Sequence, residues 1–320
     1  MNIVVATDNN FVQHCAVMLI SVLENNKHGI NIYLLSEGIT DDNFNRLKEI
    51  VISRGGHFYY ILIDSELLKS CPLPDLAGLS HISIATYYRL LIPNLLPLSV
   101  SKVIYLDCDI IVRKSIQNLW DTNIDIYAIA AVYQMTNRTL QDAQRLGYPI
   151  SFGYFNAGVL LINIYYWRTH SISLKLMNFI NSHLKDIIFH DQDALNAVLY
   201  DKCLKLSCKW NMLTIFFKKN IFEIVDINKG KIINKYDEYK TELKAEPYDP
   251  SIIHFASKPK PWDTKCTHPF RYEYYRYLKK TPWKKFTAPS PLISYLYRVI
   301  RKTLLMLTLK GETYFNVKKN

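Results

Sequence analysis

The alternation of apolar and polar positions over the first 64 residues predicts strands and helices in turn. Three short apolar runs have the length and composition of buried strands. Two stretches between them carry apolar residues three and four apart, which is helical spacing, and Gly55-Gly56 ends the second. The expected strands are residues 2–7, 31–36 and 57–64, and the expected helices are residues 11–23 and 40–54. This order indicates a parallel sheet covered by helices on both faces.

The same reasoning extends farther along the chain. Further strands are expected at 103–106, 126–132 and 158–162, and further helices at 171–184 and 191–200. No stretch approaches the ~20 uninterrupted apolar residues of a membrane-spanning helix. The chain has 320 residues, of which 49% are apolar and 21% charged. This composition excludes disordered and collagen-like proteins, and the length suits one large α/β domain with or without an appendage.

Positive charge is concentrated near the C-terminus. Residues 258–320 contain 15 Lys and Arg against three acidic residues, a net charge of +12, whereas the whole chain carries +11. Residues 1–257 are therefore close to neutral. We place the end of the main domain at residue 262, after which Lys, Arg, Tyr and Pro become dense. The basic part predicts an anionic partner, which could be a nucleic acid, an anionic membrane or an anionic glycolipid. A basic end that serves only solubility is the simpler alternative.

A basic amphipathic pattern occupies residues 292–309 of this C-terminal part. Arg298, Arg301 and Lys302 interrupt its apolar residues, so the segment is not expected to span a membrane. Two alternatives remain for it. It can lie as a helix in an anionic membrane interface, or it can pack as a terminal helix on the main domain.

The N-terminus and the cysteines both predict a cytosolic protein. The first apolar run has no basic segment before it and reaches Asp8 at once, so no signal peptide is expected. The six cysteines contain no Cys-x-x-Cys pair and are expected to be free thiols. No Gly-x-Gly-x-x-Gly follows the first strand, and no Gly-x-x-x-x-Gly-Lys occurs. A dinucleotide site and a P-loop are therefore not expected.

The sharpest chemical signal is Asp107-Cys108-Asp109, at the end of an apolar run. In an extended strand the two carboxylates would point to the same side. Like charges held so close are costly unless a cation lies between them, which predicts Mg²⁺ or Mn²⁺ at this sheet edge. Two solvated acids in a surface turn are one alternative. A phosphatase of the haloacid dehalogenase type is another, although its motif follows the first strand and usually has Thr or Val where Ile111 stands here.

Three weaker signals follow along the chain. Asn156 and Gly158 stand at the start of a strand, where Gly158 suggests a close backbone approach. Asp191 and Gln192 begin a helix, where Asp191 can serve as an N-cap or, with its polar neighbours, bind sugar hydroxyls. His254 ends an apolar strand. It can be a packed core histidine or the nitrogen ligand of a mixed metal site, with Lys260 beside it to neutralise a phosphate.

Taken in order, these motifs resemble those of the family 8 glycosyltransferases, which are retaining enzymes of GT-A fold. The resemblance covers roughly residues 2–262. The basic, Tyr-rich end is similar to the C-terminal extension of the lipopolysaccharide-core members. The motifs that carry the resemblance are Ala6-Thr7-Asp8-Asn9-Asn10, Ser83-Ile84-Ala85-Thr86-Tyr87-Tyr88-Arg89, Asp107-Cys108-Asp109, Phe155-Asn156-Ala157-Gly158, Asp191-Gln192-Asp193 and His254 with Lys260-Pro261-Trp262.

The resemblance implies donor-binding roles for the residues that match. Asp8 and Asn10 would hold uracil and ribose, and Ala6 belongs to the same substrate-binding loop. Arg89 would contact the sugar-phosphate of the donor. Asn156 and Asp191 would hold sugar hydroxyls. Gln192 would lie beside the anomeric carbon, so that Asp191 and Gln192 would both bind substrate and take part in catalysis.

Around the diphosphate, the resemblance implies a metal site and a basic residue. Asp107, Asp109 and His254 would bind Mn²⁺ or Mg²⁺, and Lys260 would bind the departing diphosphate and stabilise its charge. Ser257 stands where family members usually have a Gly whose backbone contacts the diphosphate. We therefore expect Ser257 in the substrate site, with a slightly altered loop around it.

The sequence as a whole then predicts a metal-dependent retaining transferase. It would move glucose or galactose from a UDP-sugar to the lipid-anchored lipopolysaccharide core, as a cytoplasmic protein peripheral to the inner membrane. The expected fold is α/β of GT-A type, with a Rossmann-like mixed sheet flanked by helices over residues 1–262. A basic aromatic helical extension, 263–320, would contact an anionic membrane and the acceptor, and no nucleic-acid partner is expected. The alternatives are a transferase for another cell-surface glycan and the phosphatase above.

Overall fold

The computed structural model describes most of the chain. The described residues are 1–27, 29–64, 66, 84–134, 139–217, 224–226, 231–233, 239, 241–243 and 249–286. The expected amphipathic segment at 292–309 lies outside them. Among the described residues, no helix has the length and apolar character needed to cross a bilayer.

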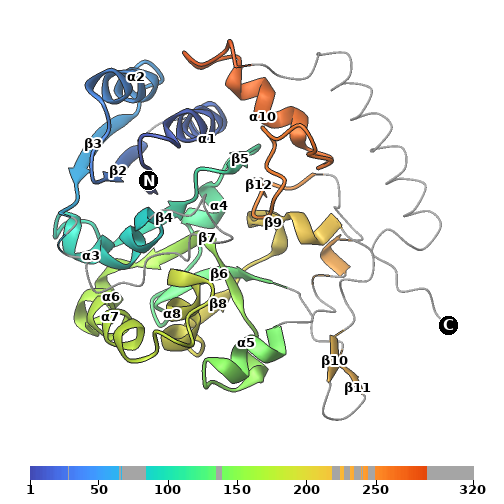
Figure 1. The fold of residues 1–320 in the computed structure, drawn as a ribbon. Helices are drawn as coiled ribbons and strands as arrows, with labels where there is room; N and C mark the ends of the chain where they lie inside the picture. Colours follow the sequence, from blue (N-terminus) through green and yellow to red (C-terminus); the bar gives the residue numbers. More distant parts are fainter. Residues whose placement is uncertain are drawn as a thin grey trace.

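A seven-stranded mixed sheet forms the centre of the fold, with strand order β3-β2-β1-β4-β7-β6-β8 (Figure 1). The strands β3, β2, β1 and β4 are parallel, whereas β7 is antiparallel to both β4 and β6. The expectation of a mixed sheet is confirmed. The strands are β1 (Asn2–Ala6), β2 (Asn31–Ser36), β3 (His57–Leu62), β4 (Lys102–Leu106), β6 (Ile129–Tyr133), β7 (Phe155–Asn163) and β8 (Cys203–Lys205).

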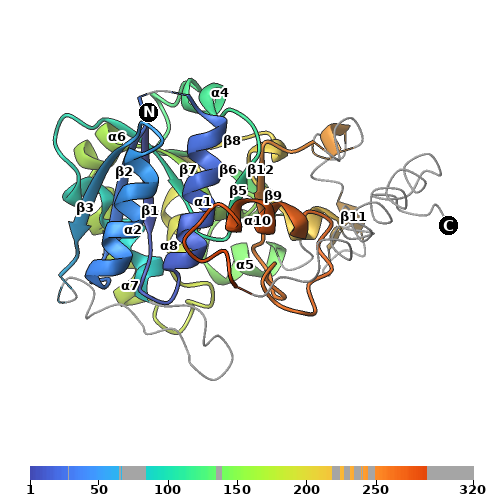
Figure 2. The same ribbon diagram turned by 90° about the horizontal axis from the view of Figure 1, so that it is seen from above.

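Helices cover both faces of this sheet, as the alternating pattern predicts. The helices α1 (Val12–Asn25) and α2 (Asp41–Ile52) pack on one face. The opposite face carries α3 (Ile92–Leu95), α6 (Ile164–Thr169), α7 (Ile172–Ser182) and α8 (His190–Leu199) (Figures 1 and 2). The described part of the chain also contains α4 (Gln117–Trp120), α5 (Thr139–Arg145) and α10 (Arg271–Leu278), with 3₁₀ helices at Ile84–Leu91, Ile150–Phe152, Cys208–Trp210 and Thr214–Phe217.

A second, three-stranded sheet has the order β5-β12-β9. Its strands are β5 (Ile110–Val112), β9 (Met212–Leu213) and β12 (Ile252–His254). The strand β12 is antiparallel to β5 and parallel to β9, and His254 pairs with Ile110. A separate two-stranded pair joins β10 (Ile224–Asp226) and β11 (Lys231–Ile233). The sequence pattern predicted the apolar run at β12 but not that it would form a sheet of its own with β5 and β9.

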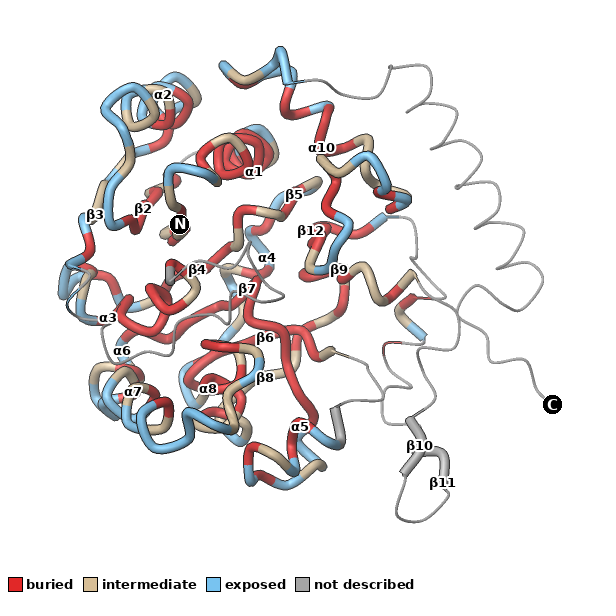
Figure 3. The backbone as a smooth tube through the Cα atoms, in the orientation of Figure 1, coloured by how far each residue is buried: buried red, intermediate tan, exposed pale blue. Residues whose placement is uncertain are grey.

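The helix α1 is buried on nearly all sides, and not only at the apolar positions three and four apart from which it was expected. Buried residues are concentrated in the central strands and in α1 (Figure 3). The reason is that α1, which covers one face of the sheet, also contacts α2, β5 and α10 (Figure 1). A helix enclosed in this way can be apolar around its whole circumference.

The described part of the basic C-terminal region, residues 263–286, packs on the main domain. The contact starts directly before this region, at Trp262, whose ring stacks on that of His14 with 3.5 Å between the ring centroids and 15° between the planes. The His14 Nδ1 is 2.8 Å from the Tyr274 hydroxyl, and Asn25 Nδ2 donates to the Tyr277 hydroxyl at 2.9 Å. Figures 1 and 2 both show α10 beside α1. The proposed division of the chain at residue 262 stays a prediction.

This packing predicts a measurable dependence of stability on pH. Burial lowers the pKa of His14 from 6.5 to about 4, although Asp109 opposes the shift. Because the folded-state pKa is the lower one, His14 favours folding above pH 6.5, and that contribution is lost as the pH falls toward 4. The full contribution of His14 to the pH dependence of the free energy of unfolding is about 3 kcal/mol. We expect His14→Phe to lose less stability than the unaltered protein between pH 7 and pH 4.5, measured by denaturant unfolding. The control is His57→Gln, which alters an exposed histidine. If the free energy of unfolding of His14→Phe depended on pH as steeply as that of the unaltered protein, this account would be contradicted.

Candidate functional site

A cavity of about 570 Å³ opens where β1 and β4 end. Its lining includes nearly all of the residues that the sequence predicts for the site. These are Ala6, Asp8, Arg89, Asp107, Asp109, Asn156, Asp191, Gln192, His254, Ser257 and Lys260. Asn10 is the exception. Its side chain is exposed and does not line the cavity, and its backbone N–H donates to Asp8 Oδ1 at 2.9 Å.

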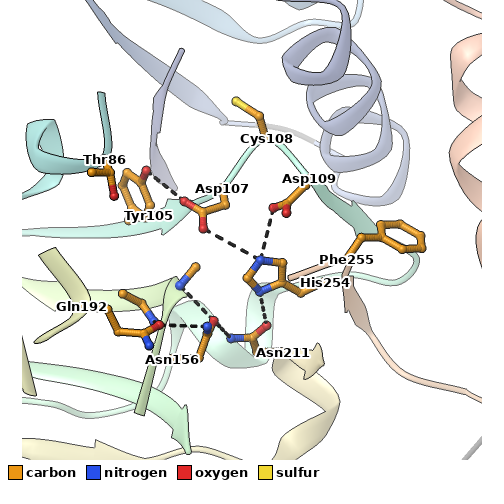
Figure 4. A network of polar contacts seen from close by, with 12 residues as sticks. Thr86, Tyr105, Asp107, Cys108, Asp109, Asn156, Gln192, Asn211, His254 and Phe255 are labelled. Atoms are coloured by element: carbon orange, nitrogen blue, oxygen red, sulfur yellow. Dashed lines mark hydrogen bonds and ion pairs between the residues drawn. The ribbon is translucent and has the colours of Figure 1, made fainter. Parts of the chain in front are cut away.

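The pair Asp107 and Asp109 occupies the turn between β4 and β5 rather than an extended strand. The period-two argument used for the sequence is therefore wrong in its geometry, although both carboxylates still face one group. His254 Nε2 lies 3.1 Å from Asp109 Oδ1 and 3.8 Å from Asp107 Oδ2 (Figure 4). The pairing of β12 with β5 brings His254 beside the turn from a position 145 residues later in the chain than Asp109.

Gly158 provides the space that this cluster needs. A Cβ at this position would lie 2.2 Å from His254 Cε1 and 2.8 Å from Asp107 Oδ2. Both distances are far below van der Waals contact, and neither of these atoms lies at the end of a long, flexible side chain. The close backbone approach expected at Gly158 is confirmed, and the atoms that approach it are those of two predicted metal ligands.

The donor set of this cluster fits a divalent cation. One ligand atom from each of Asp107, Asp109 and His254 lies within 4.8 Å of the others. Two carboxylate oxygens and one imidazole nitrogen are a set that Mn²⁺ accepts and Mg²⁺ tolerates. Burial by itself would raise the pKa of Asp109, but Lys260 and His254 hold it well below its ordinary value. Asp109 is therefore ionised in the folded protein.

Lys260 lies directly beside the cluster. Its Nζ donates to Asp109 Oδ2 at 2.5 Å and to the carbonyl oxygen of Phe255 at 2.7 Å. The side chain is largely buried, so the ion pair is poorly screened by water. The partner of Lys260 in this structure is the carboxylate of Asp109. Its expected binding of the diphosphate stays a prediction.

Arg89 connects the metal cluster to the other side of the cavity. This buried guanidinium donates to Asp107 Oδ1 at 2.9 Å and pairs with Asp191 Oδ2 at 2.9 Å. It also donates to the carbonyl oxygen of Ala157 at 2.5 Å. Burial would lower the pKa of Arg89, but Asp107 and Asp191 raise it above its usual range. Arg89 is thus a fixed cation between two acidic side chains.

Asp191 is not the N-cap of α8. The capping position is Phe189, which makes no side-chain cap hydrogen bond, and Asp191 lies in the first helical turn. Its Oδ1 accepts a hydrogen bond from the Thr86 hydroxyl. Burial raises the pKa of Asp191 to about 6, although Arg89 opposes the shift. The backbone N–H groups of Ile188 and Phe189 donate instead to Asp193 Oδ2, each at 2.7 Å.

The Gln192 side chain is held at both ends. Its Oε1 accepts from Asn156 Nδ2 and from the backbone N–H of Ala157, both at 3.0 Å. Its Nε2 donates to the Tyr154 hydroxyl at 3.1 Å. The amide plane of Gln192 therefore has one orientation in the cavity wall.

Three residues of the site have no role predicted from the sequence. A signal exists for Thr86, which stands beside Arg89 in a motif that carries the resemblance. Phe11 lines the cavity next to Asp8, but the sequence pattern predicts for it only a place in a helix. Asn211, which contacts both His254 and Asn156, stands in an irregular segment after Trp210 and is marked by no spacing or motif.

Comparison with known proteins accounts for this arrangement. Residues 2–266 match the model of the family described as glycosyl transferase family 8. The chain belongs to this family.

Relatives of the glycosyltransferase span nearly its whole length. It is 32% identical over 295 residues to general stress protein A of Bacillus subtilis, covering 91% of this chain and 97% of that one. It is 27% identical over 307 residues to a lipopolysaccharide 1,3-galactosyltransferase of Salmonella typhimurium, covering 94% and 84%. The solved galactosyltransferase LgtC, crystallised with donor and acceptor sugar analogues, is 25% identical with a TM-score of 0.74 and covers 91% and 98%.

Family membership decides between the glycosyltransferase and the phosphatase, which were both considered from the sequence. The enzyme is a glycosyltransferase of GT-A fold. The phosphatase alternative is wrong. The fold agrees with this correction, because the Asp-x-Asp pair follows β4 rather than the first strand.

The charge of Asp109 should control metal binding by the glycosyltransferase. Asp109→Asn keeps the shape of the side chain but removes one anionic ligand. We expect the affinity for Mn²⁺ to fall at least about tenfold with the fold unchanged, as for other disturbed metal sites. Electron paramagnetic resonance titration with and without UDP measures the affinity, and circular dichroism checks the fold. Asp249→Asn removes an exposed, ion-paired acid outside the cavity and should leave the affinity unchanged. Unaltered Mn²⁺ affinity in a folded Asp109→Asn variant would refute the metal assignment.

Proposed function

We propose that this glycosyltransferase moves glucose or galactose from a UDP-sugar onto lipopolysaccharide core, with retention at the anomeric carbon. One observation carries the proposal. The Asp107, Asp109 and His254 cluster lines the same cavity as Lys260 and as the Asp191 and Gln192 pair. A cation site for a diphosphate thus adjoins polar groups suited to sugar hydroxyls.

The two halves of the donor would lie along this cavity. Ala6, Asp8 and Asn10 would hold the nucleoside at the end of β1, with Phe11 offering an aromatic ring beside them. Asn10, whose side chain does not line the cavity, would take part by holding Asp8, since its backbone N–H donates to Asp8 Oδ1. Ser257, in the loop after β12, would provide a polar group near the diphosphate.

Charge stabilisation at the diphosphate is the main catalytic contribution in this proposal. Mn²⁺ or Mg²⁺ held by Asp107, Asp109 and His254 would neutralise the negative charge that develops on the leaving group. Lys260 supplies a second positive charge from the same wall of the cavity. With the donor bound, both charges would be in place before the sugar–diphosphate bond breaks, which is the condition under which electrostatic stabilisation is strongest.

The sugar would be positioned by Arg89, Asn156, Asp191 and Gln192. Thr86 and Arg89 engage one carboxylate oxygen each of Asp191, so Asp191 is better suited to positioning hydroxyls than to attacking carbon. Gln192 presents a neutral amide. We therefore favour same-face attack, in which the acceptor hydroxyl forms its bond to the anomeric carbon as the sugar–diphosphate bond breaks.

The lipopolysaccharide acceptor is proposed from the relatives and from the basic C-terminal region. One relative is named a lipopolysaccharide 1,3-galactosyltransferase and another, from Escherichia coli, a lipopolysaccharide 1,2-glucosyltransferase at 24% identity. After α10, Lys279, Lys284, Lys285 and Phe286 are exposed. These side chains would bind an anionic surface, which supports a location on the cytoplasmic face of the inner membrane.

A transferase for another cell-surface glycan is the second candidate. The observation that favours it is the 32% identity to general stress protein A of Bacillus subtilis, whose name specifies no lipopolysaccharide. A glycosyltransferase of Streptococcus pneumoniae, GlyB, also matches at 26% identity over 92% of this chain. The donor site is common to both candidates, and only the acceptor separates them.

A panel of nucleotide sugars tests the donor assignment without an acceptor. We expect slow, Mn²⁺-dependent hydrolysis of UDP-glucose or UDP-galactose, abolished by EDTA, because water can replace the acceptor hydroxyl at the anomeric carbon. Release of UDP is measured by coupled assay or chromatography, and GDP-mannose is the matched control. Hydrolysis of GDP-mannose in preference to both UDP-sugars would contradict the proposal. Purified lipopolysaccharide core then distinguishes the two acceptor candidates.

Charge reversal tests the membrane contact. We expect Lys284→Glu with Lys285→Glu, in the full chain, to reduce binding to anionic vesicles at least tenfold, since each basic residue near such a surface contributes ~1 kcal/mol. The hydrolysis of the donor should not change. Lys175→Glu with Lys185→Glu alters the same charge on exposed residues at and after α7, away from α10, and should have little effect (Figure 1). Equal loss of vesicle binding in both double variants would show that only net charge matters.

A further inference from the structure

Asn211 is fully buried between the second sheet and the cavity wall. It follows the 3₁₀ helix Cys208–Trp210 and directly precedes β9. Its side chain does not line the cavity, yet it lies between His254 and Asn156, which both do (Figure 4). Asn211 Oδ1 is 2.9 Å from His254 Nδ1, and Asn211 Nδ2 donates to Asn156 Oδ1 at 2.8 Å.

Two backbone N–H groups determine which way the amides of this network point. The N–H of Gly158 donates to Asn156 at 3.0 Å, so the accepting atom of Asn156 must be its oxygen. The N–H of Ala157 donates likewise to the oxygen of Gln192, which leaves Asn156 Nδ2 as the donor to Gln192. Backbone amides cannot reverse their role. The orientation of Asn156 is therefore fixed by its surroundings.

The orientation of Asn211 follows from that of Asn156. The atom of Asn211 that faces the Asn156 oxygen lies 2.8 Å from it, and two oxygens at that distance would repel each other. This atom must therefore be Nδ2, and the Oδ1 of Asn211 must face His254. An amide oxygen only accepts hydrogen bonds, so the Nδ1 of His254 must carry a proton. The Nε2 of His254 is then the nitrogen that faces Asp107 and Asp109 and can bind a metal.

The same amide also supports the sugar side of the cavity. Asn156 accepts from Asn211 and donates to Gln192, and Gln192 donates to Tyr154. Loss of Asn211 would leave one hydrogen bond unmade at His254 and another at Asn156. Both groups are buried, so water cannot replace the missing partner.

We propose that Asn211 is a positioning residue that sets the tautomer of His254 for metal binding and, by its hydrogen bond to Asn156, supports the side chain that donates to Gln192. The inference deepens the proposed function and rests on it for the sugar side. The metal side stands on the donor set alone. One buried amide would thus couple the two halves of the cavity without touching either ligand.

Two substitutions separate these roles. Asn211→Asp keeps an oxygen acceptor for His254 but places a second oxygen against Asn156 Oδ1. We expect Mn²⁺ affinity within about threefold of that of the unaltered protein and donor hydrolysis reduced at least tenfold. Asn211→Leu removes both partners at similar volume, and we expect Mn²⁺ affinity to fall tenfold to a hundredfold. Affinity is measured by electron paramagnetic resonance with and without UDP.

Asn163→Leu is the matched control for a merely structural effect. Asn163 is a buried asparagine at the far end of β7, where it accepts from the Tyr166 backbone N–H and donates to the carbonyl oxygen of Ile124. Its loss should lower the melting temperature without changing Mn²⁺ affinity.

Unchanged Mn²⁺ affinity in a folded Asn211→Leu variant would overturn the metal role. Full hydrolysis by Asn211→Asp would overturn the coupling to Gln192. If Asn211→Leu does not fold, a tenfold loss of Mn²⁺ affinity in Asn211→Asp overturns the acceptor role. Failure of the unaltered protein to hydrolyse any UDP-sugar would contradict the proposed function instead, and the Mn²⁺ titrations would still decide the metal role.

Discussion

Asp107 and Asp109 bring two negative charges to one largely enclosed turn, and cationic or potentially cationic groups from three separate segments surround them. Arg89 comes from the 3₁₀ helix before α3, His254 from β12 and Lys260 from the loop after it. Carboxylates are costly to bury unless they are paired. Three features allow the two carboxylates to be paired. They are the short second sheet, the absence of a side chain at Gly158 and the close packing of the Lys260 loop.

The order of the strands determines which groups can meet. The strand β7 lies next to β4 and runs antiparallel to it, so its first residues reach the end of β4 where the two aspartates stand. Asn156 and Gly158 therefore face the acidic turn, and α8 places Gln192 against Asn156. A wholly parallel sheet would have put the end of β7 at this edge, and its first residues at the other.

Local patterns in the sequence predicted the main strands and helices and the acidic pair, because these depend on neighbours along the chain. Other features could not be predicted in this way. The burial of α1 on all sides depends on α10, which is more than 240 residues away. The role of Asp191 depends on its contact with Arg89, and that of Asn211 on the meeting of β9, β12 and β7. The motif resemblance supplied Arg89 and Gln192, for which composition and spacing alone carry little information.

The ion pair between Lys260 and Asp109 has a consequence for the order of ligand binding. A cation bound by the carboxylates of both Asp107 and Asp109 competes with the ammonium group of Lys260, which already contacts Asp109. Once displaced, that ammonium group needs another anion, and a diphosphate can provide it. By thermodynamic linkage, the cation and the diphosphate should then each strengthen the binding of the other. The enzyme would hold its metal weakly between turnovers and tightly only with a nucleotide donor in place.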